Sequence, residues 1–154
     1  MRRTLLALAM VLSVGVVAGC GSSSSSGGTT RTPSTGFFIS ISSFNFSPVN
    51  LAAPPGATIT VINDDGAPHS VTSENAPETY TPGGVAGVSF DTGAFTGQAT
   101  FTLPSGIADG TVIPYYCSVH RDMMATKTGT ITIQASAQPT SAPGSSTTGS
   151  GSGY

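Results

Sequence analysis

The chain has 154 residues, of which only 8% are charged, and it contains 20 glycines and 11 prolines. This composition favours turns and short strands over helices, so we expect an all-β protein. After residue 19 the chain keeps three basic and seven acidic residues, and 3 − 7 gives a formal net charge of −4. Because there is no basic patch, we expect no nucleic-acid partner.

The first 19 residues have the pattern of an export signal peptide. A charged start at residues 1–3 is followed by an apolar run over residues 5–18 and by small residues before Cys20. Residues 17–20 resemble the lipobox of bacterial lipoproteins, in which the cysteine is lipidated and becomes the first mature residue. The alternatives are an ordinary signal peptide and an uncleaved membrane helix, for which the run is short. We expect a bacterial cell-envelope protein, exported and anchored to the membrane by a lipid on Cys20.

Two segments have a composition that is too polar for a hydrophobic core. Residues 20–36 are mostly glycine, serine and threonine, which is typical of a flexible linker. Residues 136–154 have a similar composition, and we expect them to form a disordered tail. The folded domain is therefore predicted to span residues 37–135, a common domain size.

Apolar residues alternate along several segments of this domain, as expected for strands. In the first segment the alternation changes phase near Ser42 and Ser43, which indicates a break or bulge in the strand. Tyr115 and Tyr116 are expected to face opposite sides of their strand. The predicted strands span residues 37–46, 58–61, 70–72, 88–90, 98–103, 111–117 and 128–134. The simplest structure that buries two sets of alternating residues is a Greek-key β-sandwich of about seven to eight strands.

The residues suited to metal binding are few. His69 and His120 are the only histidines, and Cys117 is the only remaining thiol if Cys20 carries lipid. His120 follows Cys117 by three residues, so a tight loop after a strand would bring both side chains to one point. Two imidazoles, one thiolate and a weak thioether form the ligand set of blue-copper electron-transfer sites. We expect one copper ion per chain, although zinc can occupy similar ligands.

The chain resembles the cupredoxins, in particular the plastocyanin and amicyanin group. The resemblance covers residues 37–134 and rests on five motifs, which lie at residues 44–48, 55–61, 68–69, 90–93 and 115–120. It implies that His69, Cys117 and His120 are the equatorial ligands. The Cys-x-x-His-x-x-Met spacing of amicyanin-like proteins implies Met123 as the axial ligand, with Met124 as its competitor. In place of the asparagine that commonly follows the first ligand, this chain has Ser70, whose hydroxyl could make only part of the usual link to the cysteine loop.

The resemblance implies a carrier of single electrons between redox proteins, which would dock transiently near His120. The alternative is a protein that stores or delivers copper in the envelope. We do not expect an enzyme, because both histidines are used by one site and no Ser-His-Asp or paired-carboxylate arrangement remains. We expect a monomer, and we expect Asp91 and the acids near Asp64 to lie in solvated loops.

Overall fold

The computed structural model describes residues 33–144. The predicted signal peptide, the lipidation site Cys20 and most of the predicted linker therefore lie outside the described residues. Among residues 33–144 no helix is long and apolar enough to cross a membrane.

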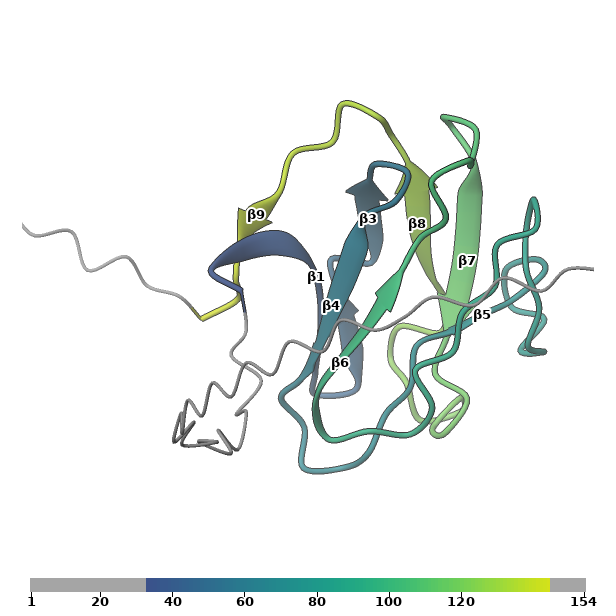
Figure 1. The fold of residues 1–154 in the computed structure, drawn as a ribbon. Coiled ribbons are helices and arrows are strands. Elements are labelled where there is room, and N and C mark those ends of the chain that lie inside the picture. Colours follow the sequence, from purple (N-terminus) through teal and green to yellow (C-terminus); the bar gives the residue numbers. More distant parts are fainter. Residues whose placement is uncertain (1–32, 145–154) are drawn as a thin grey trace, which may run out of the picture. The chain divides into compact units, whose positions relative to one another are not determined.

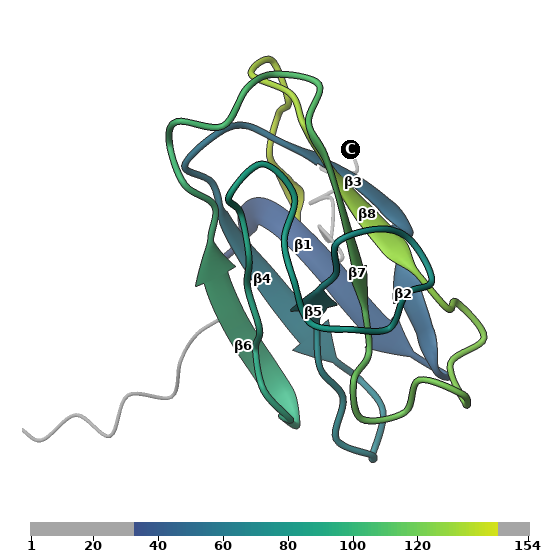
Figure 2. The ribbon, with the colours of Figure 1, turned by 90° about the vertical axis from the view of Figure 1, so that its right-hand side faces the viewer.

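The described chain forms two β-sheets that face each other (Figures 1 and 2). The first sheet has the order β2-β1-β4-β6, and β9 pairs with β1 outside this path. The second sheet has the order β3-β8-β7-β5. The strands of the first sheet are β1 (Thr35–Ser42), β2 (Asn45–Ser47), β4 (Thr58–Asn63), β6 (Gly97–Thr102) and β9 (Thr140–Ser141). Those of the second sheet are β3 (Asn50–Ala53), β5 (Thr72–Ser73), β7 (Val112–Tyr116) and β8 (Gly129–Ile133).

Both sheets are mixed. The pairs β1–β4 and β3–β8 are parallel, and all other strand pairs are antiparallel. The chain changes sheet at every connection from β2 to β7 and again between β8 and β9. Because the chain crosses to the other sheet between them, β1 and β4, and likewise β3 and β8, lie parallel without helical connections. The predicted all-β sandwich is confirmed, with nine strands in the described part instead of seven or eight.

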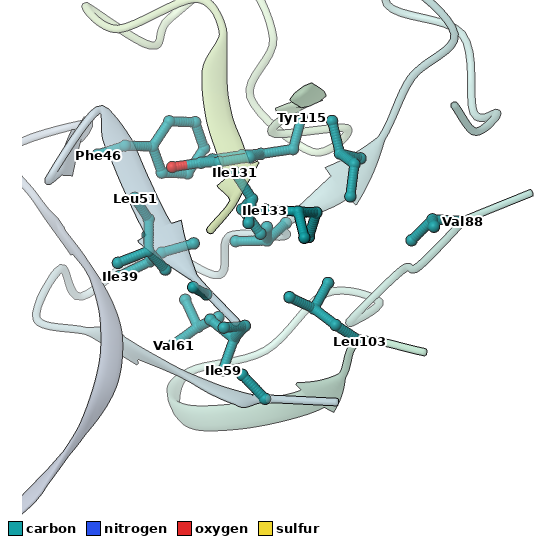
Figure 3. Packing of buried hydrophobic residues seen from close by; sticks show 14 of the residues in the cluster. Ile39, Phe46, Leu51, Ile59, Val61, Val88, Leu103, Tyr115, Ile131 and Ile133 are labelled. Atoms are coloured by element: carbon teal, nitrogen blue, oxygen red, sulfur yellow. The ribbon is translucent and has the colours of Figure 1, made fainter. Parts of the chain in front are cut away.

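The core lies between the sheets and is built from the alternating residues (Figure 3). Ile39 of β1 and Val61 of β4 point from one sheet, and Ile131 and Ile133 of β8 point from the other; all four are completely buried. Burying one such side chain stabilises the fold by roughly 1.5–3 kcal/mol. This core fixes the two sheets, and the loops at their ends carry the polar residues discussed below.

The predicted break in the first strand is confirmed. β1 ends at Ser42, and Ser43 and Phe44 adopt left-handed backbone conformations, with φ angles of 51° and 59°. The chain then returns as β2, antiparallel to β1. This turn lies at the same end of the sandwich as the loop after β4 and the loop between β7 and β8 (Figures 1 and 2).

The structure departs from the sequence predictions in several places, among them β3, which was not predicted, and β5, which spans residues 72–73 instead of 70–72. β9 pairs with β1 through Thr35 and Gly36, so the described fold extends beyond residues 37–135 and includes part of the predicted tail. Residues 88–90 form no strand, and Val88 alone makes one isolated bridge, to Val85. Tyr115 belongs to the core cluster as one of the two tyrosines was expected to, but Tyr116 is buried as well, because Tyr80 from the β5–β6 connection packs 5.9 Å from its ring.

Candidate metal centre

The loop after β4 positions His69. Asn63, the last residue of β4, donates from its side-chain amide to the carbonyls of Ala67 and Phe95. His69 itself exchanges two backbone hydrogen bonds with Phe95, at 3.0 and 2.9 Å. The His69 side chain is thereby fully buried at the end of the sandwich.

Cys117 directly follows β7 and is a free, completely buried thiol. The backbone N–H groups of Ser70 and His120 both point at its sulfur, each at 3.4 Å. Such donors stabilise a thiolate and fix its direction. The sulfur lies 3.5 Å from Nδ1 of His69.

His120 lies in the β7–β8 loop and is half-buried. Its Nδ1 atom is buried and has no hydrogen-bond partner. Among the described residues it is the one buried side-chain nitrogen or oxygen without a partner. An unpartnered buried nitrogen costs free energy unless something binds it. The Phe44 ring lies edge-on to both imidazoles, with centroids 4.9 Å from His69 and 5.4 Å from His120.

The three predicted equatorial residues come together. The ligand atoms of His69, Cys117 and His120 all lie within 4.8 Å of one another. Among residues 33–144 this is the one group of three or more histidine, cysteine and acidic side chains placed to hold a metal ion. Two imidazoles, one of them with an unpartnered Nδ1, and one thiolate fit a transition metal of the copper or zinc type, because imidazole and thiolate are ligands that these ions prefer.

The two methionines occupy very different environments. Met123 is 64% exposed, whereas Met124 is 1% exposed and belongs to the same buried cluster as Cys117. The backbone N–H groups of both residues donate to the carbonyl of His120, so they lie in one tight turn and their side chains leave it in different directions. The predicted axial ligand, Met123, therefore has an exposed side chain. The thioether that lies in the interior is that of Met124.

Asp65 was not predicted to take part in the site. Its carboxylate accepts a hydrogen bond from His69 Nε2 at 3.0 Å and two more from the backbone N–H groups of Ser43 and Phe44, at 2.6 and 2.9 Å. Burial raises the pKa of Asp65, but these hydrogen bonds outweigh it and leave that pKa below its usual value. Burial also lowers the pKa of His69, against the opposing effect of Asp65, which favours the neutral imidazole that binds metals.

Ser70 makes the link to the cysteine loop more completely than expected. Its hydroxyl accepts a hydrogen bond from Ser118 N at 2.8 Å and also lies within hydrogen-bond distance of the Ser118 and Thr72 hydroxyls. Thr72 in turn donates to Asp91 at 2.9 Å, so Asp91, which is exposed as expected, also ends a chain of hydroxyl groups. Three short polar side chains thus connect the His69 loop with the Cys117 loop. Their positions come from pairing between β5 and β7, which no local sequence pattern indicates.

No family model matches the sequence, and no curated protein matches it significantly. Solved structures do match. An oxidized amicyanin variant is 17% identical, with 64% of this chain and 82% of that chain covered and a TM-score of 0.47. A purple cupredoxin from Nitrosopumilus maritimus is 24% identical, with 64% and 99% covered and a TM-score of 0.44. A reduced amicyanin variant is 14% identical, with 68% and 87% covered and a TM-score of 0.48.

The chain resembles cupredoxins. The likeness is one of fold at low sequence identity. What this cupredoxin-like chain can bind is therefore argued from its own residues, above all from the buried group of His69, Cys117 and His120.

Proposed function

We propose that the chain binds one copper ion through His69 Nδ1, Cys117 Sγ and His120 Nδ1 and carries single electrons with it. The observation that carries this proposal is the unpartnered, buried Nδ1 of His120, in an imidazole that offers a ligand atom within 4.8 Å of those of His69 and Cys117. When bound, copper would supply a centre that alternates between Cu(II) and Cu(I). The protein supplies a ligand set with both soft and intermediate donors, which suits both oxidation states.

We further propose Met124, not Met123, as the weak fourth ligand. A thioether beside the metal must be inside the protein, and Met124 is buried in the cluster that contains Cys117. Met123 is mostly in contact with solvent. A thioether as fourth donor favours copper over zinc, whose structural and catalytic sites use nitrogen, oxygen and thiolate ligands.

The ligands are held in place before any metal binds, which suits electron transfer. His69 is held by Asp65 and Phe95, and Cys117 accepts two backbone N–H groups. A site that changes little between two oxidation states has a low barrier to gaining or losing an electron. Preorganisation of this kind therefore supports a carrier role. Catalysis at a further metal centre would need a second group of metal ligands, and residues 33–144 contain none of three or more histidine, cysteine and acidic side chains.

The surface beside His120 is suited to brief contacts with redox proteins. His120 is half-buried, and the apolar side chains of Val119 and Met123 are 39% and 64% exposed next to it. These residues line one shallow cleft together with Tyr80 and Arg121. A small apolar area with a nearby ligand imidazole is what a transient electron-transfer partner would contact.

Export, and anchoring of the mature protein in the cell envelope through Cys20, belong to the same proposal and rest on the sequence of residues 1–20.

The alternative is storage or delivery of copper without electron transfer. We expect the copper-loaded protein to be reduced and reoxidised reversibly at an electrode, and to exchange electrons between Cu(I) and Cu(II) molecules without losing metal. Loss of copper on reduction, together with transfer of copper to a chelating acceptor protein, would favour the delivery role and contradict the carrier role.

A further inference from the structure

We propose that Asp65 is the positioning residue of the metal centre, fixing which nitrogen of His69 faces the metal. The inference rests on the proposed function, because it concerns the ligand role of His69. The key contact is the 3.0 Å hydrogen bond between His69 Nε2 and the carboxylate of Asp65. The Asp65 side chain is 14% exposed, so this contact is largely shielded from water.

The contact determines the tautomer of His69. An ionised carboxylate is only an acceptor, so His69 Nε2 must carry the hydrogen and Nδ1 must present its lone pair. That lone pair lies on the side of Cys117, 3.5 Å from the sulfur. Without a carboxylate at this place nothing would hold the hydrogen on Nε2, and the tautomer with the hydrogen on Nδ1 cannot bind metal through that atom.

The position of the carboxylate is itself fixed from a third loop. The backbone N–H groups of Ser43 and Phe44 both donate to it, and both residues have left-handed backbone conformations. The same turn holds the Phe44 ring against His69 and His120. One carboxylate thus connects the β1–β2 turn, which carries no ligand, with the ligand His69.

The charge of Asp65 also bears on the preference for oxidation state. A carboxylate that accepts the second N–H of a ligand histidine makes the imidazole a stronger donor, and loss of such a partner typically costs 10–100-fold in metal affinity. A stronger donor favours Cu(II) over Cu(I). We therefore expect Asp65→Asn to weaken Cu(II) binding by at least about tenfold relative to Cu(I), which corresponds to a rise in reduction potential of ~59 mV for a one-electron couple.

The test uses the full chain with Asp65→Asn, Asp65→Glu and the matched control Asp64→Asn. Asp64 is the exposed neighbour, and no hydrogen bond of its carboxylate occurs among the described residues, so its replacement changes the net charge equally without changing the contact. Nitrogen-15 NMR of the metal-free protein reports the His69 tautomer directly. Electrochemistry and competition titration of the copper-loaded protein report the potential and the affinity.

We expect wild-type protein and Asp64→Asn to show His69 protonated at Nε2 and to share one potential. Asp65→Asn should raise the potential and weaken Cu(II) binding, and Asp65→Glu should restore part of both. If wild-type protein binds copper but Asp65→Asn matches Asp64→Asn in tautomer, potential and affinity, Asp65 is only a turn residue and the inference is overturned. If wild-type protein binds no copper, the proposed function fails, while the His69 tautomer in Asp65→Ala, whose side chain offers no acceptor to Nε2, still decides whether Asp65 positions His69.

Discussion

Replacing the two adjacent methionines separates the proposed buried ligand, Met124, from the exposed side chain of Met123. Met124 is 1% exposed in the core cluster, so Met124→Ala removes its packing and leaves a cavity, with an expected cost of about 2–5 kcal/mol. Met123 is 64% exposed, so Met123→Ala should change the free energy of unfolding by no more than about 0.5 kcal/mol. Urea unfolding of the metal-free protein measures both values.

The leucine variants test the ligand role at nearly constant volume. Met124→Leu should cost less than about 1.5 kcal/mol in the metal-free protein. With copper bound, it should nevertheless shift the visible spectrum and the reduction potential, because the thioether is lost. Met123→Leu should leave both unchanged. A spectrum that changes with Met123→Leu and not with Met124→Leu would refute the assignment drawn from burial.

Three further predictions concern the surroundings of the site. Ser70→Ala should lower the free energy of unfolding by about 1–3 kcal/mol, since Ser118 N loses its acceptor; a change below about 0.5 kcal/mol in urea unfolding would contradict this. Burial raises the pKa of Tyr115, so the fold should lose stability as the pH rises above 10.0, where the unfolded chain ionises; Tyr115→Phe should reduce this loss, and an unchanged alkaline unfolding curve would count against it. Gly129→Ala should cost at least about 1–3 kcal/mol in thermal unfolding, because its Cβ would overlap the Tyr115 ring, and full retention of stability would show that the ring can move aside.

The main features of the fold and of the centre could be predicted from the sequence because their signals are local or rest on scarcity. Alternation of apolar residues predicted the strands that carry Ile39, Val61 and Ile131, and a change of phase predicted the turn after Ser42. The two histidines and Cys117 were predicted as one group because few alternatives exist in the chain, and the structure brings them together.

The features that could not be predicted depend on contacts between distant segments. Asp65 was expected to lie in a solvated turn. The sequence near Asp65 does not indicate that its carboxylate accepts a hydrogen bond from Phe44 in the β1–β2 turn, 21 residues earlier in the chain. Strand alternation placed one of Tyr115 and Tyr116 outward, but the loop carrying Tyr80 covers the outward ring, which is that of Tyr116. The axial ligand is a local question instead: the spacing favoured Met123, which stays a prediction, and the turn at His120 leaves Met123 exposed and Met124 buried.

The visible and paramagnetic resonance spectra of the full chain with one equivalent of Cu(II), measured beside Cys117→Ser, test the central claim most directly. If Cys117 binds copper together with His69 and His120, the wild-type protein should be intensely blue to purple through charge transfer from the thiolate, and Cys117→Ser should lose this colour. A colourless wild-type copper complex, or a colour that persists in Cys117→Ser, would contradict the account.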